Sequence, residues 1–224
     1  MRTPAPLGPV TARGIAAEAA HMIREAIMNG TFRPGEELRE GALAESLAVS
    51  RGSVREGLSI LEREGIIRTG WHRPATVIPA SRHHARSLYR LRAGLERIAA
   101  QGAAEQAREG ASGFAEPLER LRTALSDGAE RSGVVRADLE FHDAVYALAD
   151  NAPLTSAWQA IRSQIRLYQL LRSTEPETGY DSSLVSEHEQ YADIVASGDE
   201  EAAGRYAERH VESALEVLLE RLAD

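Results

Sequence analysis

Residues 43–67 read LAESLAVSRGSVREGLSILEREGII, and this stretch decides how the first part of the chain folds. A short helix is expected over residues 40–47, and Ser50 is a good N-cap for a second helix over residues 51–63. The apolar residues of that second helix recur at helical spacing, at Val54, Leu58 and Leu61. Gly65 then ends it, so the pattern predicts two helices joined by a tight turn.

The flanking segments complete a small domain. A longer helix is expected over residues 11–29. Its apolar residues lie near helical spacing, at Ile15, Ala19, Met22, Ile23, Ala26 and Ile27. Residues 66–67 and 76–78 are expected to form two short strands around a turn. The order helix, helix, turn, helix, hairpin predicts a winged helix-turn-helix domain over residues 1–80.

The remainder of the chain, residues 81–224, contains no stretch that is typical of a strand. Helical stripes recur instead between glycines and prolines, near 88–98, 114–126, 134–148, 154–171, 182–196 and 199–222. The first stripe is expected to bury Leu88, Leu91, Leu95 and Ile98. The protein is therefore expected to be mainly α, with the winged domain followed by an all-helical bundle of about six helices.

Composition excludes several classes of protein. The chain has 224 residues, a net charge of −8 and no cysteine, which excludes disulfide scaffolds, zinc fingers and thiol nucleophiles. Its charge is uneven, because residues 1–80 hold ten arginines against nine acidic residues and residues 81–224 hold sixteen against twenty-five. No apolar stretch approaches the ~20 residues of a membrane span, and the N-terminus lacks the apolar core of a signal peptide. A cytoplasmic protein without a membrane partner is expected.

The second helix of a helix-turn-helix places its N-terminal residues against base edges in the major groove of DNA. Arg51 and Arg55 lie one turn apart here, Ser53 can contact a phosphate or a base, and Gly52 allows close approach of the backbone. Together with Ser50, these residues are the candidate DNA contacts. The alternative is that the two arginines only solvate an exposed helix face.

This stretch resembles the winged-helix domain of the GntR family of bacterial transcription regulators. The matching residues are Gly30, Pro34, Gly35, Leu38, Leu43, Ala44, Leu47, Val49, Ser50, Arg51, Val54, Arg55, Glu56, Leu58, Leu61, Glu62 and Gly65. The resemblance implies that double-stranded operator DNA is a partner. Family members often carry a further DNA-contacting arginine where this chain has Gly41, and Arg39 is its candidate substitute. Arg73 is the candidate contact of the wing.

Three histidines fall on apolar faces of the expected C-terminal helices. They are His142, His188 and His210, and Asp138 lies one turn before His142. One interpretation makes each histidine a hydrogen-bonded core residue. The other brings three imidazole nitrogens and one carboxylate oxygen together in the bundle as a site for zinc, nickel or manganese.

The same residues resemble the FCD domain, the C-terminal ligand-binding domain of the FadR branch of the GntR family. That domain commonly binds a divalent metal through an Asp-x-x-Phe-His type helix and two later histidines. The matching helix segment here runs from Asp138 to His142, and the two later histidines are His188 and His210. The resemblance implies a divalent ion, zinc first, and a small carboxylate effector held by Arg92. For Arg92 the alternative is a salt bridge with Glu96.

These inferences predict a ligand-responsive repressor that binds a two-fold symmetric operator as a homodimer and is not an enzyme. One alternative is a dimerisation bundle with a purely structural metal. Another is a metal-dependent hydrolase that uses Glu187 or Glu140 as general base. Both glutamates are sequence neighbours of proposed ligands and are expected to point away from them. The chain also has no nucleophile motif, phosphate loop or dinucleotide fingerprint.

Overall fold

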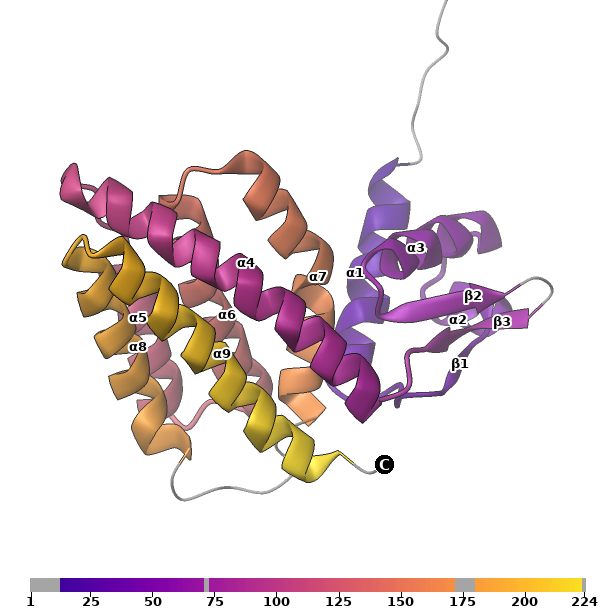
Figure 1. The fold of residues 1–224 in the computed structure, drawn as a ribbon. Coiled ribbons are helices and arrows are strands. Elements are labelled where there is room, and N and C mark those ends of the chain that lie inside the picture. The colour runs from indigo at the N-terminus through magenta and orange to yellow at the C-terminus, as the bar shows by residue number, and fades with distance from the viewer. Residues whose placement is uncertain (1–12, 71–72, 172–179, 223–224) are drawn as a thin grey trace, which may run out of the picture. The chain divides into compact units, whose positions relative to one another are not determined.

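The computed structural model describes residues 13–70, 73–171 and 180–222 (Figure 1). Internal contacts divide the chain into two compact units, Met1–Ile78 and Pro79–Asp224. Each unit is considered by itself.

The first unit has the winged helix-turn-helix fold that the sequence predicts. Its elements are α1 (Arg13–Met28), β1 (Glu37–Leu38), α2 (Glu40–Ser46), α3 (Arg51–Arg63), β2 (Ile67–Gly70) and β3 (Arg73–Val77). The strands form an antiparallel sheet in the order β1-β3-β2. Strand β1 was not expected, because two residues are too few for an alternating pattern. Its Leu38 pairs with Ala75 and is fully buried.

Helix α3 begins where a side chain caps it and packs closely against α1. The Ser50 hydroxyl accepts a hydrogen bond from the Ser53 backbone N–H at 3.1 Å. On the buried face, a Cβ added to Gly57 would lie 3.0 Å from the backbone oxygen of Ala16. A glycine is therefore needed for α1 and α3 to approach this closely.

The apolar face predicted for α1 is partly wrong. Ile15 and Met22 are 51% and 48% exposed. The buried residues are three alanines and three larger side chains: Ala16, Ala19, Ala20, Ile23, Ile27 and Met28. The physical reason is the close packing against α3. This packing favours alanines on the contact face, whereas the prediction placed the large apolar residues there.

The second unit contains six helices among the described residues, as expected. They are α4 (Arg82–Arg108), α5 (Ala115–Ser126), α6 (Arg131–Leu148), α7 (Ala152–Leu171), α8 (Tyr180–Ala196) and α9 (Glu200–Arg221). Helix α9 runs alongside α4 (Figure 1). Their close approach depends on Gly204, because an added Cβ there would meet Gln101 Cγ at 2.9 Å.

The leucine stripe predicted for α4 is only partly its core face, because Leu88 alone of its four residues is buried. Leu91 and Ile98 are each 51% exposed, and Leu95 is half-buried. The buried face consists of Ala85, Leu88, Tyr89, Arg92, Ala93, Glu96, Ala99, Ala100, Ala103 and Ala104. Within one chain, nothing described covers the leucine face, whereas the alanines permit close helix packing. The real core face contains an arginine and a glutamate, which need a structural explanation.

No helix in the described parts of either unit is both long and apolar enough to cross a membrane.

Candidate functional site

The three histidines meet inside the second unit, each carried by a different helix. His142 lies on α6, His188 on α8 and His210 on α9, and one ring nitrogen from each lies within 4.8 Å of the others. His142 and His188 are fully buried, and the His210 side chain is 9% exposed. Asp138 of α6 is buried beside them. The structure thus brings together the four predicted metal ligands.

The contact between His188 and Asp138 indicates that a positive charge belongs there. His188 Nδ1 lies 2.7 Å from the carbonyl oxygen of Leu184, and a carbonyl only accepts, so Nδ1 carries the proton. The Nε2 of a neutral ring is then an acceptor, yet it lies 3.0 Å from Asp138 Oδ1, which is also an acceptor. Two acceptors at this distance repel each other unless a proton or a metal ion lies at the contact.

His142 presents a second bare nitrogen. Its Nδ1 lies 2.5 Å from Glu96 Oε1, and the ionised carboxylate accepts the proton of that nitrogen. Its Nε2 is buried and has no hydrogen-bond partner among the described residues. Buried polar atoms are rarely left unpaired, so an unpaired imidazole nitrogen beside two further ligand groups fits a metal site.

Electrostatics keep two of these groups in metal-binding form. Burial raises the pKa of Asp138, but a positive charge at its contact with His188, together with His142 and Arg92, outweighs that effect and holds the pKa well below its ordinary value. Burial, together with His188 and His142, holds the pKa of His210 well below its ordinary value. Asp138 is therefore ionised and His210 neutral. Three imidazoles and one carboxylate suit a divalent transition metal.

Arg92 lies in the interior next to this cluster and is only 1% exposed. Its Nε is 3.8 Å from Glu96 Oε2, which is an ion-pair distance but too long for a hydrogen bond. Its Nε and Nη1 have no hydrogen-bond partner among the described residues. The guanidinium carbon lies 5.8 Å from the Tyr89 ring centroid and 5.7 Å from that of Trp158. The alternative salt bridge exists but leaves two guanidinium donors unused.

Several partners of the cluster were missed from the sequence. Gln169 Nε2 donates to Asp138 Oδ2 at 2.7 Å, and Glu96 holds His142. Glu96 could have been found, since Arg92 and Glu96 lie at helical spacing with Leu88 and Ala99. Of the two glutamates of the hydrolase alternative, Glu187 does not point away from the proposed ligands as expected, because its Oε2 lies 3.7 Å from His210 Nδ1. The Glu140 carboxylate accepts from Arg120 at 2.9 Å.

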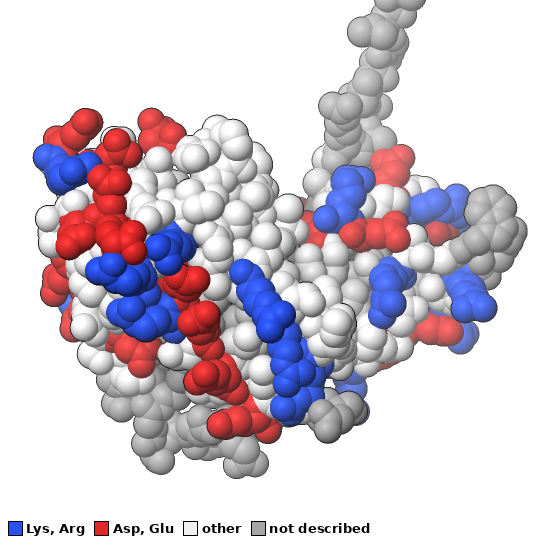
Figure 2. Space-filling view, viewed as in Figure 1, with Lys and Arg blue, Asp and Glu red and all other residues white. Residues whose placement is uncertain are grey.

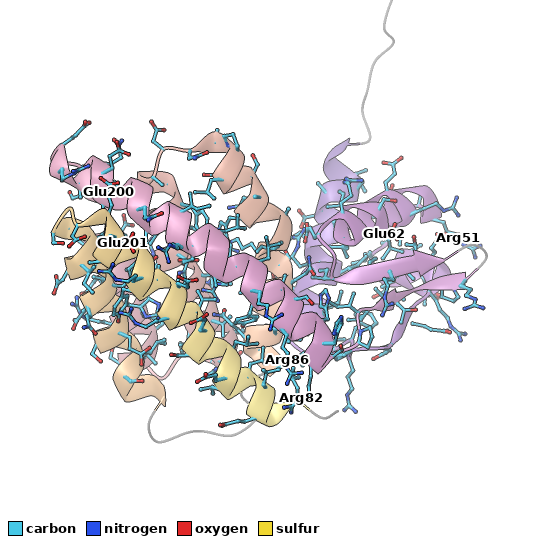
Figure 3. All side chains as sticks on the ribbon, viewed as in Figure 1. Arg51, Glu62, Arg82, Arg86, Glu200 and Glu201 are labelled. Atoms are coloured by element: carbon cyan, nitrogen blue, oxygen red, sulfur yellow. The ribbon has the colours of Figure 1, made fainter. Side chains whose placement is uncertain are left out.

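The N-terminal turn of α3 presents exposed side chains, and Figure 3 labels Arg51 there. The Ser50 and Ser53 hydroxyls lie 2.9 Å apart, so both belong to the helix cap. Gly52 is exposed. The Arg51 guanidinium lies over Gly41, where an added Cβ would meet its Nη2 at 3.5 Å. Arg51 thus occupies space that a side chain at position 41 would otherwise use.

Arg55 is held in place from the neighbouring helix. Its Nε and Nη2 donate to the two carboxylate oxygens of Glu40 on α2 at 3.0 and 2.8 Å. The hydrogen bond to Arg55 lowers the pKa of Glu40. The pair engages one side of the guanidinium fork and leaves the donors at its far end, on Nη1 and Nη2, for another partner.

The remaining predicted contacts lie on the same unit. Arg39 precedes α2 and donates to Glu37 Oε2 from Nε at 3.3 Å and from Nη2 at 3.1 Å. Arg73 is exposed at the start of β3, opposite Gly70. The residues between them, Trp71 and His72, lie outside the described residues.

Comparison with known proteins places both units. Residues 87–213 match the FCD domain, and residues 15–77 match the bacterial regulatory proteins of the gntR family. The probable D-xylose utilization operon transcriptional repressor of Paenarthrobacter nicotinovorans is 26% identical, over 90% of this chain and 88% of its own length. The Nta operon transcriptional regulator of Aminobacter aminovorans is 29% identical, over 84% and 87%. The uncharacterized regulator YdhC of Bacillus subtilis (strain 168) is 25% identical, over 85% and 84%.

Solved structures share the fold. A GntR transcriptional regulator structure from Rhodococcus sp. RHA1 superposes with a TM-score of 0.78 at 23% identity, covering 94% of this chain and 100% of its own. The E. coli protein McbR/YncC gives a TM-score of 0.76 at 18% identity, covering 95% and 99%. The two domain matches, in the order that the fold requires, establish that this chain belongs to the gntR family of bacterial regulatory proteins with an FCD domain, and is a DNA-binding transcriptional regulator rather than an enzyme.

Proposed function

We propose that this regulator is a ligand-responsive repressor whose FCD domain holds one divalent metal through Asp138, His142, His188 and His210. The observation that carries the proposal is the pair of bare Nε2 atoms on His142 and His188, which no described donor satisfies. Zinc is the first candidate, and nickel and manganese are the alternatives. The bound metal would supply a Lewis-acid centre for an oxygen of the effector.

The buried charges support a small carboxylic acid as effector. Arg92 contributes one positive charge, and Glu96 and Asp138 one negative charge each, while the histidines that bind a metal are neutral. A divalent cation leaves a net charge of +1 in this interior, and a buried uncompensated charge is costly. One carboxylate cancels it. The two unused donors of Arg92 are suited to hold that carboxylate.

Calorimetry with zinc and a panel of small carboxylic acids tests this site. The purified protein should contain up to one divalent ion per chain, and a cognate acid should raise the melting temperature of the zinc-loaded protein. At a hundredfold excess over the Kd, the acid contributes about 2.7 kcal/mol. Arg92→Gln should lose this response and keep the metal. Zinc binding with no response to any acid would favour a structural metal, and absence of metal binding would return the histidines to core residues.

We propose that α3 enters the major groove of operator DNA. Arg51 and Arg55 would read bases, and Arg39, Ser50, Gly52, Ser53 and Arg73 would contact the backbone or groove walls. The far end of the Arg55 fork is the pair of donors that fits guanine O6 and N7, which supports this assignment.

Binding sites selected from a random duplex pool provide the probe for this interface. Arg51→Ala and Arg55→Ala should each lower discrimination between selected and random duplexes by about 1 to 3 kcal/mol. Arg63→Ala, at the other end of α3, is the matched control and should not. Equal weakening on both kinds of DNA would mean phosphate contacts, and no weakening would exclude these residues from the interface.

The exposed face of α4 and α9 supports a homodimer. Leu91 and Ile98 are exposed on α4. Figure 2 shows basic side chains along α4 beside acidic ones along α9. The residues are Arg86 and Arg90 on α4, and Glu212, Glu216 and Glu220 on α9, all exposed. A two-fold axis would set the basic line of each copy against the acidic line of the other. Leu91→Glu should yield monomers by sedimentation, whereas Ile15→Glu, equally exposed on α1, should not.

Helix α7 connects the metal site with the linker to the DNA-binding unit. Its Gln169 holds the Asp138 carboxylate, and the adjacent Tyr168 hydroxyl bonds both the N–H and the carbonyl of Ser81, at 3.3 and 3.4 Å. Effector binding would act on DNA through this helix, provided that the acid binds the DNA-competent and DNA-incompetent states with different affinity. The repressor relative supports a repressor role for this chain.

A further inference from the structure

Glu96 is the most enclosed carboxylate among the described residues, with 0% exposure in the middle of α4. It faces three donors besides Arg92. His142 Nδ1 lies 2.5 Å from Oε1, Tyr146 Oη lies 3.3 Å from Oε2, and Tyr191 Oη lies 3.4 Å from Oε1. These donors come from α6 and α8, the helices that also carry Asp138, His142 and His188. The carboxylate therefore links α4 to two of the three helices that carry the histidines.

The distances show that Glu96 interacts mainly with His142 and less closely with Arg92. Its bond to His142 is 2.5 Å, while Arg92 Nε stays at 3.8 Å without a hydrogen bond. A counter-ion for Arg92 would be expected to form the forked hydrogen bonds that arginine and carboxylate favour. The carboxylate is aligned on the imidazole instead, and Tyr146, which stacks on Trp158 at 4.9 Å, helps to hold it there.

We infer that Glu96 is a positioning residue for the metal site: it fixes His142 in the tautomer with the proton on Nδ1, so that Nε2 is presented bare to the cluster. This inference rests on the proposed metal site. A carboxylate behind a ligating histidine orients the ring and makes its other nitrogen a stronger donor. The Leu184 carbonyl fixes His188 in the same tautomer, because it accepts the proton on Nδ1. Two of the three histidines are thus set for a metal by fixed acceptors that are not ligands.

The tautomer can be measured in the metal-free full-length protein. Long-range proton–nitrogen NMR spectra should show His142 protonated at Nδ1 only, with its signals assigned by comparison with His142→Asn. A ring protonated at Nε2, or an even mixture of the two tautomers, would overturn the inference. This measurement needs no bound metal and no variant of Glu96, so it decides the matter even if substitutions at Glu96 impair folding.

Zinc affinity, measured by competition with a chromophoric chelator, gives the second test. Glu96→Gln removes the charge and keeps the shape, and it should weaken zinc binding about 10- to 100-fold. Tyr191→Phe is the matched control: it removes a longer bond to the same carboxylate and should change zinc affinity far less. Equal zinc affinity in the wild type and a folded Glu96→Gln protein would contradict the inference. Absence of zinc binding by the wild type would instead contradict the proposed function, while the NMR result would still decide the role of Glu96.

Discussion

Asp138→Asn should stabilise the metal-free protein and strongly reduce its stabilisation by zinc. The asparagine amide can donate from the position of Oδ1 to the bare Nε2 of His188, 3.0 Å away, and its oxygen can still accept from Gln169. Satisfying a buried acceptor and removing its repulsion is worth about 1 to 2 kcal/mol. For a chain of this size that raises the Tm by roughly 2 to 8 °C. The substitution also brings the buried charge of the metal-free interior to zero.

The core-residue interpretation predicts the opposite sign. If His188 were protonated and paired with Asp138, neutralising the carboxylate would leave a buried unpaired charge, at a cost of about 3 to 5 kcal/mol. The metal-free variant would then melt well below the wild type. One substitution therefore separates the two interpretations by direction rather than by size.

Scanning calorimetry in a chelating buffer and in excess zinc measures both effects. Zinc at a hundredfold excess over the wild-type Kd should stabilise the wild type by about 2.7 kcal/mol. A site weakened about a hundredfold should gain only about 0.4 kcal/mol under the same conditions. Asp143→Asn is the matched control, because Asp143 accepts from Trp158 and Arg162 outside the cluster and its loss should leave the zinc response intact. A metal-free Asp138→Asn protein that melts several degrees below the wild type would refute the reasoning.

Three further predictions concern other parts of the molecule. Gly57→Ala should lower the stability in urea unfolding by about 1 to 3 kcal/mol because of its contact with α1. Glu40→Gln should loosen Arg55 and remove a negative charge near the DNA, so fluorescence anisotropy should show tighter binding to random duplex and less discrimination. Tyr168→Phe should leave zinc and acid binding intact but reduce the effect of the acid on DNA affinity; an unchanged effect would exclude the hydroxyl from the coupling.

The helices of the winged domain could be predicted with nearly correct ends, because capping residues and helix-terminating glycines surround α2 and α3. Ser50 caps α3, and the wing strands follow a glycine. The faces of α1 and α4 were harder to predict. In both helices alanines make up much of the core side, and the large apolar residues Ile15 and Leu91 are exposed. The helical spacing of the large apolar residues predicts that the face carrying them is buried. Close packing between helices instead buries a face that carries small residues.

The candidate site could also be predicted only in part. Its four proposed ligands could be named from the sequence because each lies on an apolar helix face. The residues that orient these ligands could not, because they contact them from helices that are distant in the chain. Glu96 and His142 are 46 positions apart, and Asp138 and Gln169 are 31 apart. Sequence spacing orders residues along one helix but cannot indicate which helices face each other. Glu96, which the sequence offered as a salt-bridge partner of Arg92, is thus mainly a hydrogen-bond partner of His142.

In the proposed function, the buried charges also impose an order on the binding of the metal and the acid. With the histidines in the neutral form that a metal site requires, and without a metal, Arg92, Glu96 and Asp138 sum to −1, which repels a carboxylate and attracts a cation. With a divalent ion the sum is +1, which attracts one carboxylate, and that carboxylate completes neutrality. The acid should therefore bind only after the metal. Because the Asp138 carboxylate is held by Gln169, next to the tyrosine that holds the linker, an adjustment of Asp138 during these steps would act directly on α7. In the proposed function, the metal ligand Asp138 is thus also the residue through which ligand binding would reach the DNA-binding unit.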